Sequence, residues 1–291
     1  MPKIRFILNP ISGGANAGRQ RQARVSAFIQ RHQLDAEIAL TQYPKHATTL
    51  AQAAVADGYE LVVAVGGDGT LNEVARALVN QPVDFGLVPS GSGNGFARHL
   101  GLPLDFDQAL AVLLRGQIQR VDSALAGGIP FFNVFGAGLD AEIAQRFNQS
   151  PQRGPLPYFW LGWQTWRNYQ PRVYELELDG QAVYSSEAAL ICVANISQYG
   201  NNAQIAPGAD ITDGQLDVVA IRQPNFGASI QLARRLFAGS LLQHPLVWHR
   251  RASTVRISLP KGAAAHTDGE LHDFGQTVEI NCLPQSLRVR V

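Results

Sequence analysis

Cysteine is scarce in this sequence of 291 residues. The two cysteines, Cys192 and Cys282, both stand in apolar surroundings, and no metal-binding spacing links them. This scarcity excludes a disulfide-rich secreted scaffold and a metal centre built from paired thiolates. We therefore expect a reduced, cytoplasmic protein.

Long apolar runs and an excess of charge of one sign are also missing. No run approaches the roughly 18 apolar residues of a membrane-spanning helix, and no apolar export segment follows the N-terminal residues. The 24 Lys and Arg residues nearly balance the 23 Asp and Glu residues, which speaks against a nucleic-acid partner. Any work on lipids would be done from the membrane surface, peripherally at its inner face. The sequence leaves open whether the chain forms a homodimer.

Apolar residues are plentiful, at 46% of the chain, and their spacing predicts two domains. In the first part, short apolar strands alternate with helical repeats such as Leu71, Val74, Ala75 and Leu78. We expect an α/β domain with a doubly wound parallel sheet over residues 1–124. Residues 125–291 are rich in short strands and Asp-Gly or Gly-Gly turns, with helices predicted at 139–147 and 228–243. They predict a mainly antiparallel β-sandwich, whose last strand is a candidate for returning to the first domain.

A glycine-rich loop follows the apolar strand "LVVAV" and precedes a helix. Gly66 and Gly67 would let the backbone turn sharply after the strand, and Gly69 would let phosphate approach the backbone. Thr70 opens the helix whose positive end faces the same place. The loop matches neither a P-loop nor a dinucleotide-binding fingerprint. Asp68 would repel phosphate unless a cation lies between them, so its presence favours Mg²⁺. An ordinary strand-to-helix turn is the simpler alternative.

A second loop of this type, "PSGSGNGFA", follows the next strand. Because the carboxyl ends of neighbouring parallel strands meet at one edge of a sheet, both loops should line one crevice there. The pair makes a nucleotide-phosphate site more plausible than either loop alone.

These motifs resemble those of the diacylglycerol kinase and sphingosine kinase superfamily of lipid kinases. The resemblance rests on "GGDGTLNEV" and "PSGSGNGFA", together with "NPISGG" at 9–14, "APGADITDGQLDV" at 206–218 and "HTDGEL" at 266–271, which occur in the family's order. It implies an ATP- and Mg²⁺-dependent kinase that phosphorylates a lipid hydroxyl.

The resemblance also implies roles for individual residues. Glu270 matches the proton acceptor, Asp268 stands beside it in the same motif, and Asp68 is expected to act with the metal during catalysis. Nucleotide-contacting roles are implied for Asn9, Thr41, Gly66, Gly67, Asp68, Gly69, Thr70, Asn72, Glu73, Ser92 and Asn94. Positions around a bound Mg²⁺ in the bacterial branch match Asp210, Asp213 and Gln215.

Gly95 departs from the diacylglycerol kinase pattern, which usually has Asn-Asp where this chain has Asn94-Gly95. A small residue after Asn resembles the sphingosine and ceramide kinase branch, so the lipid stays open. The alternatives are an NAD kinase-like enzyme, which shares the first loop, and a nucleotide- or lipid-binding regulator without turnover. Read alone, "HTDGEL" is also typical of a simple hairpin turn.

An aromatic stripe and a basic segment are open to two interpretations. Phe159, Trp160, Trp163 and Trp166 follow helical spacing, which suits either core packing or an acyl-chain or membrane contact. The segment "WHRRASTVR" suits either a solvated strand face or anionic lipid headgroups.

Overall fold

The computed structural model describes residues 2–11, 15–149, 165–166 and 169–291. The chain divides into two compact units, one made of residues 1–122 and 285–291 and the other of residues 123–284. Of the aromatic stripe, only Trp166 belongs to the described residues; Phe159, Trp160 and Trp163 lie outside them.

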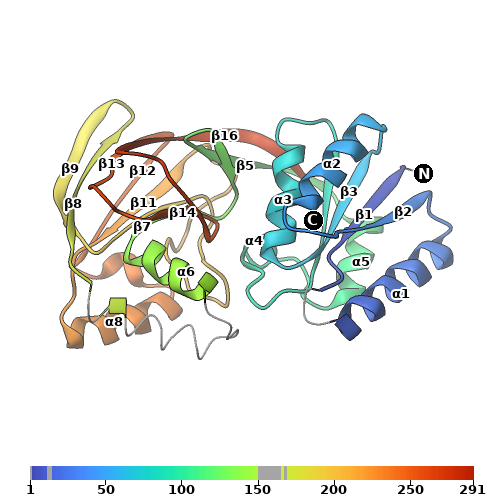
Figure 1. Cartoon of the computed structure of the whole chain (residues 1–291), viewed down its shortest axis with the longest axis horizontal. Coiled ribbons are helices and arrows are strands. Elements are labelled where there is room, and N and C mark those ends of the chain that lie inside the picture. Colours follow the sequence, from blue (N-terminus) through green and yellow to red (C-terminus); the bar gives the residue numbers. More distant parts are fainter. Residues whose placement is uncertain (1, 12–14, 150–164, 167–168) are drawn as a thin grey trace. The chain divides into compact units, whose positions relative to one another are not determined.

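The first unit is built on a parallel sheet (Figure 1). Its elements are β1 (Ile4–Leu8), α1 (Ala15–His32), β2 (Ala36–Leu40), α2 (His46–Ala56), β3 (Leu61–Gly66), α3 (Asp68–Leu78), β4 (Asp84–Pro89), α4 (Gly95–His99) and α5 (Phe106–Arg115). The strands follow the order β2-β1-β3-β4 and all pair in parallel. The doubly wound architecture expected from the sequence is confirmed.

The central strand β3 is buried on both of its faces. All six of its residues are buried, because α1 and α5 cover one face and α2 and α3 contact the other. Phe6, Val63 and Val65 point to the side of α1 and α5, where they pack with Val25 and Leu110. The two glycine-rich loops begin at the carboxyl ends of β3 and β4.

The second unit is a β-sandwich, as the sequence predicts. Its elements are β5 (Ile118–Ala126, which begins in the first unit), β6 (Ile129–Phe131), β7 (Val134–Gly138), α6 (Leu139–Gln149), β8 (Arg172–Leu178), β9 (Gln181–Ala188), β10 (Leu190–Ala194), β11 (Leu216–Ile221), α8 (Phe226–Phe237), the 3-10 helix η1 (Leu241–Gln243), β12 (Val247–Ala252), β13 (Thr254–Ser258), β14 (Ala265–Thr267), β15 (Glu270–His272) and β16 (Thr277–Arg290). One sheet has the order β12-β11-β10-β7-β14-β15 and is antiparallel throughout.

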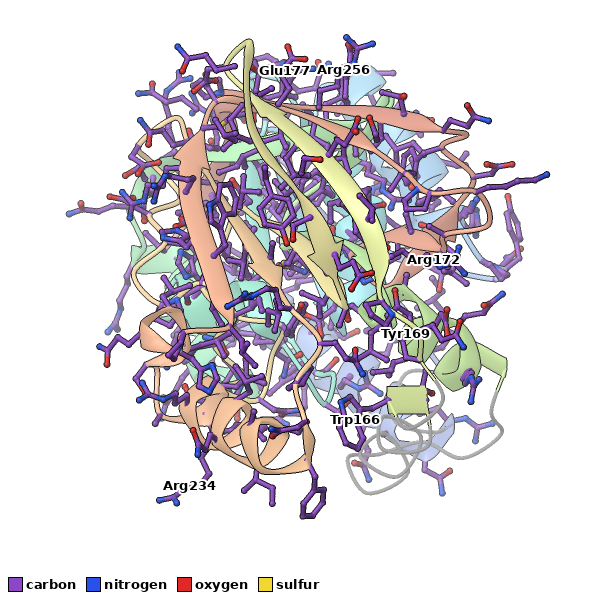
Figure 2. All side chains as sticks on the ribbon, turned by 90° about the vertical axis from the view of Figure 1, so that its left-hand side faces the viewer. Trp166, Tyr169, Arg172, Glu177, Arg234 and Arg256 are labelled. Atoms are coloured by element: carbon purple, nitrogen blue, oxygen red, sulfur yellow. The ribbon has the colours of Figure 1, made fainter. Side chains whose placement is uncertain are left out.

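The other layer of the sandwich contains β16, β13, β8 and β9. Tyr174 and Ile257 from this layer share one buried cluster with Phe135 and Val218 from the first sheet. On the outer face, Arg256 of β13 stands in register with Glu177 of β8 (Figure 2). Opposite charges at such a cross-strand position suit a solvated strand face.

One predicted helix is shorter than expected. The sequence predicts a single helix over residues 228–243, whereas α8 ends at Phe237 and only η1 follows. Gly239 has a φ of 66°, in the left-handed region, which a right-handed helix does not accommodate. The glycine therefore ends the helix.

The longest strand, β16, belongs to both units. Its first residues pair antiparallel with β13, with Ile280 opposite Val255, whereas its last residues pair in parallel with β4, with Arg288 opposite Asp84. The side chains of Arg288 and Arg290 both bond the carboxylate of Asp84. The sheet of the first unit is thus completed by residues from the end of the chain.

Candidate active site

The two glycine loops of the first unit touch at bare backbone. A Cβ built on Gly91 would lie 2.6 Å from the Cα of Gly67, and one built on Gly66 would lie 2.6 Å from the Oγ1 of Thr70. Neither Gly66, Gly67 nor Gly91 has a positive φ. Gly67 and Gly91 are therefore explained by the close approach of the two loops, and Gly66 by the neighbouring side chain of Thr70, rather than by a left-handed turn. Around Gly69, by contrast, an added Cβ would meet no atom within 4 Å.

Asp68 joins the first loop to the second. Its Oδ1 accepts a hydrogen bond from the N–H of Gly95 at 2.9 Å, and its Oδ2 accepts one from the N–H of Asn94 at 2.8 Å. Burial raises the pKa of the Asp68 carboxyl, and the hydrogen bonds from Asn94 and Gly95 work in the opposite direction. The carboxylate thus satisfies backbone donors at the beginning of α4.

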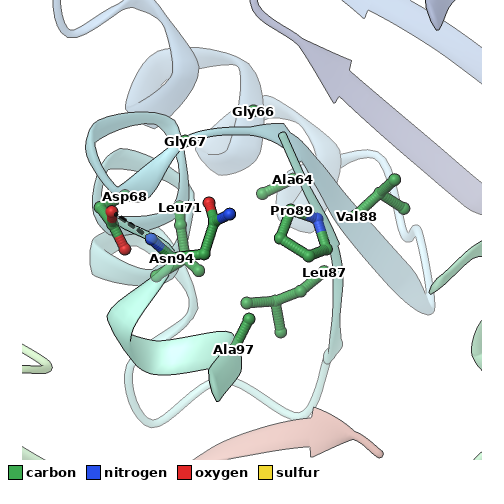
Figure 3. Close-up of a pocket in the computed structure, with 10 residues that line it drawn as sticks. All are labelled: Ala64, Gly66, Gly67, Asp68, Leu71, Leu87, Val88, Pro89, Asn94 and Ala97. Atoms are coloured by element: carbon green, nitrogen blue, oxygen red, sulfur yellow. Dashed lines mark hydrogen bonds between the residues drawn. The ribbon is translucent and has the colours of Figure 1, made fainter. Parts of the chain in front are cut away.

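The second loop is closed on itself by Asn94. This buried residue has a φ of 50°, which asparagine tolerates better than most residues. Its Oδ1 accepts from the N–H of Gly91 at 3.0 Å and its Nδ2 donates to the carbonyl of Gly91 at 2.9 Å. A small pocket lies where the loops meet, lined by Asp68 and Asn94 and by apolar residues such as Leu87 (Figure 3).

Two other predicted residues bond neighbouring segments, Asn9 through a side chain and Glu73 through backbone N–H groups. Asn9 donates to the Oγ1 of Thr70 at 3.4 Å, so the loop after β1 reaches the first glycine loop. Glu73 caps α2, because its two carboxylate oxygens accept from the N–H groups of Lys45 and Ala47, each at 3.1 Å.

The remaining residues predicted to contact nucleotide occupy the same end of the unit. Thr41 donates its N–H to the carbonyl of Leu8, at the end of β1. Asn72 is 4% exposed, and its Oδ1 has no hydrogen-bond partner among the described residues. Ser92 is exposed at the tip of the second loop.

Arg21 also belongs to this site, although no motif of the sequence contains it. It lies on α1, is 6% exposed, and donates from Nη1 to the Oγ of Ser90 at 2.8 Å. Burial lowers the pKa of its guanidinium. The available signal was a charged residue four positions before Val25, on the apolar face of the helix.

In the second unit, Asp268 and Gly269 form the turn between β14 and β15. Their φ values are 51° and 83°, the pattern of a tight hairpin turn. The Asp268 carboxylate also accepts three backbone hydrogen bonds, from Phe132, Asn133 and Val134, at 2.9 to 3.0 Å. The motif therefore forms a hairpin turn that is tied to the backbone of residues 132–134, and half-buried Glu270 follows the turn as the first residue of β15.

The loop that contains Asp210, Asp213 and Gln215 is held by an arginine. Arg251 of β12 donates to the Oδ2 of Asp213 at 3.3 Å, to the carbonyl of Gly208 at 3.1 Å and to the buried Asp217 at 3.4 Å. The Oδ1 of Asp210 accepts from the backbone and hydroxyl of Thr212, and the N–H of Gln215 donates to Asp213.

This arrangement does not fit a divalent cation in the loop, although carboxylate and carbonyl oxygens are ligands that Mg²⁺ prefers. The guanidinium of Arg251 already supplies positive charge to Asp213 and Gly208. Among the described residues, no group of three or more His, Cys, Asp or Glu side chains could hold a metal ion. A magnesium ion at Asp210 and Asp213 stays a prediction, and it would require Arg251 to withdraw.

Comparisons with known proteins agree with these motifs. Residues 3–126 match the family model "Diacylglycerol kinase catalytic domain", and residues 133–291 match "YegS C-terminal NAD kinase beta sandwich-like domain". A diacylglycerol kinase of Bacillus subtilis is 27% identical over 93% of this chain and 90% of its own length. A diacylglycerol kinase of Mycobacterium tuberculosis is 27% identical over 99% of this chain and 94% of its own length.

Solved structures share the fold. A crystal structure of a diacylglycerol kinase from Bacillus anthracis superposes with a TM-score of 0.74 at 20% identity, covering 99% of this chain and 96% of its own. An NAD kinase from Archaeoglobus fulgidus reaches 0.57 at 14% identity, covering 99% of this chain and 93% of its own.

No helix in the described part of the chain is long and apolar enough to cross a membrane. The two family matches together span nearly the whole chain. The chain belongs to the superfamily of diacylglycerol and sphingosine kinases, and it is a kinase that transfers a phosphoryl group to an alcohol.

Proposed function

We propose that this kinase transfers the γ-phosphoryl group of ATP to the hydroxyl of a lipid (a diacylglycerol, a sphingoid lipid or a related lipid) at a membrane surface. The observation that carries the proposal is the pair of glycine loops at the carboxyl ends of β3 and β4, tied together by Asp68. The diacylglycerol kinases among its relatives support the lipid acceptor.

The first unit would bind the nucleotide. The N–H groups at the beginning of α3 have no helical acceptor, and the positive end of the helix dipole favours phosphate there. Space around Gly69 would let phosphate approach the backbone. Asn9, Thr70 and Asn72 belong to the same end of the unit, where they would complete the nucleotide contacts.

Two basic or polar residues would support the second loop. Arg21 fixes Ser90, directly before that loop, and would add positive charge near the phosphates. Ser92 is exposed and would bring its hydroxyl to the nucleotide.

Magnesium would enter with the nucleotide. Carboxylate oxygens fit this hard cation, and Asp68 is the residue of the first loop that offers them. When bound, Mg²⁺ neutralises charge on the transferred phosphoryl group. No step is assigned to the loop around Asp213, because the guanidinium of Arg251 already balances the negative charge of Asp213.

Glu270 would take the proton of the acceptor hydroxyl. A carboxylate must approach within about 3 Å of that oxygen while the new phosphorus–oxygen bond forms. Asp268, whose carboxylate is engaged by three backbone N–H groups, would hold the turn from which Glu270 projects.

A second candidate is phosphorylation of NAD, which the shared fold with an NAD kinase keeps open. A third candidate is a regulator that binds nucleotide or lipid without turnover. The kinase relatives along the whole chain favour the lipid kinase.

Labelled ATP offers a direct test. The protein is incubated with Mg²⁺ and labelled ATP in mixed micelles of diacylglycerol, sphingosine, ceramide or phosphatidylglycerol, and separately with NAD, before the products are separated. Micelles without acceptor lipid report background ATP hydrolysis. We expect label in at least one lipid and none in NAD; label in NAD alone, or in no acceptor, would contradict the proposal.

A further inference from the structure

His266 and Asp140 form a buried pair beside the turn that carries Glu270. His266, on β14, is 3% exposed, and Asp140, at the beginning of α6, is 7% exposed. The Nε2 of His266 lies 3.1 Å from the Oδ2 of Asp140. The Nδ1 of the same ring accepts a hydrogen bond from the N–H of Gly269 at 3.1 Å. One imidazole therefore connects α6 to the turn.

These partners select the tautomer of the ring. A backbone N–H can only donate, so the Nδ1 that faces Gly269 must carry a lone pair. The proton of the neutral imidazole then resides on Nε2, where the carboxylate of Asp140 accepts it. A histidine held at both nitrogens has one tautomer and one ring orientation.

The strand beneath the pair leaves room for it. Gly136 of β7 stands opposite His266 in the sheet register. A Cβ built on Gly136 would overlap both the Oδ2 of Asp140 and the Nε2 of His266. The φ of Gly136 is not positive, so space rather than backbone conformation explains this glycine.

The turn is thereby held from two sides. The Asp268 carboxylate is bonded to the backbone of residues 132–134, and the Gly269 N–H is bonded to His266. Glu270 is the next residue and begins β15. Both anchors bond the backbone on either side of the turn, and through that backbone they can act on Glu270.

We propose that Asp140 and His266 are positioning residues that set the direction of Glu270 for proton transfer. The inference rests on the proposed function, in which Glu270 is the base. Asp140 orients the imidazole, the imidazole orients the Gly269 peptide, and that peptide sets where Glu270 leaves the turn. The pair also requires a residue without a side chain at position 136, which Gly136 provides.

Two substitutions of His266 separate the two hydrogen bonds. The shorter amide of His266→Asn can place its oxygen near the former Nδ1 and accept from Gly269, whereas the longer amide of His266→Gln can reach Asp140. We expect His266→Gln to lower kcat by about 10- to 100-fold with little change in KM for ATP, because a small misplacement of a reacting group is costly. His266→Asn should retain more of the kcat.

Two further variants test the role of Gly136 and provide a control. Gly136→Ala should lower kcat in the same way as His266→Gln, because its methyl group displaces the pair. His249→Gln is the matched control, since His249 also pairs with a buried aspartate, Asp217, but lies on β12. It should lower thermal stability without a comparable loss of kcat.

The tautomer provides a readout that needs no activity. In a ¹H–¹⁵N correlation spectrum of the imidazoles, His266 should carry its proton on Nε2 and none on Nδ1 at neutral pH. A proton on Nδ1 would overturn the inference, as would a His266→Gln variant with the kcat of the unmodified protein. A protein that phosphorylates no lipid but shows the Nε2 tautomer would contradict the proposed function and leave the geometry of the pair intact.

Discussion

Asp68 and Gly95 are the first residues of two different helices, and the carboxylate of one accepts the N–H of the other at 2.9 Å. Through this bond and its companion to Asn94, the two glycine loops form one structural unit. The second loop also packs closely against the Asp68 carboxylate, because a Cβ built on Gly93 would lie 2.8 Å from the Oδ2 of Asp68. The acidic residue of the first loop therefore shapes the second.

Replacement of Asp68 by Asn separates this role from metal binding. An amide has one acceptor oxygen, so one of the two backbone N–H groups would face an NH₂ group instead. We expect the affinity for ATP to fall about 10-fold both with and without Mg²⁺, in line with the loss of one charged hydrogen bond. Equilibrium nucleotide binding measures this effect, and Asp57→Asn, at an exposed carboxylate at the end of α2, is the control. A loss seen only with Mg²⁺ would make metal binding the main role of Asp68.

Glu270→Gln tests the proposed base. The substitution keeps the size of the side chain but removes its ability to accept a proton, so phosphoryl transfer should fall by at least about 100-fold. Nucleotide affinity should stay within a few-fold, because Glu270 lies in the second unit and the glycine loops lie in the first. Single-turnover transfer from labelled ATP is the measurement, and Glu279→Gln, at an exposed position of β16, is the control. Near-normal transfer would remove Glu270 as the base.

Removal of metal should leave the loop around Asp213 unaffected as long as Arg251 is present. We expect EDTA and Mg²⁺ to give the same denaturant midpoint for the unmodified protein. Arg251→Met should lower the free energy of unfolding by about 1 kcal/mol, because the guanidinium is partly exposed and its ion pairs are screened. Millimolar Mg²⁺ should restore part of that loss by binding the vacated oxygens.

The control for this experiment is Arg250→Met, since the Arg250 side chain, among the described residues, donates a hydrogen bond only to the carbonyl of His249 and lies over Trp248. A lower midpoint in EDTA than in Mg²⁺ for the unmodified protein would instead support the metal site predicted from the sequence.

Asp179 should make stability depend on pH. Burial alone would raise the pKa of its carboxyl, but hydrogen bonds from Thr254 and Ser253 outweigh it and hold the pKa below its ordinary value. A lowered pKa in the folded state contributes stability above the unfolded pKa of about 3.9, and this contribution is lost as pH falls through the folded pKa.

Asp179→Asn is a suitable variant because asparagine tolerates the φ of 48° at this turn. It should destabilise the protein by roughly 1 kcal/mol at neutral pH, a small value because Asp179 is largely exposed. The difference should shrink as the pH falls below about 4. Urea unfolding at several pH values measures it, and a difference independent of pH would contradict the assignment.

The fold could be predicted because its signals are local. The apolar run at Leu61–Val65 and the helical repeat from Leu71 to Leu78 each specify an element within a few residues. The glycine loops were visible for the same reason. The hydrogen bond that joins the two loops could not be predicted, because Asp68 and Gly95 are 27 residues apart in the sequence.

The parts of the site that escaped prediction depend on distant pairs. Nothing near His266 in the sequence indicates Asp140, which lies 126 residues earlier. Arg251 likewise meets Asp213 only because β12 pairs with β11 directly after the loop. A charged residue inside an apolar pattern, as at Arg21, was the one local hint, and it identifies burial without naming the partner.

The path of β16 has a consequence for how the chain is made. Residues 1–122 are synthesised long before residues 285–291. The edge of β4 therefore stays unpaired while the whole second unit is synthesised. An unpaired strand edge is a site of wrong pairing with other chains. A fragment that stops at residue 122 should therefore be prone to aggregate, and supplying the missing strand as a separate peptide should relieve it.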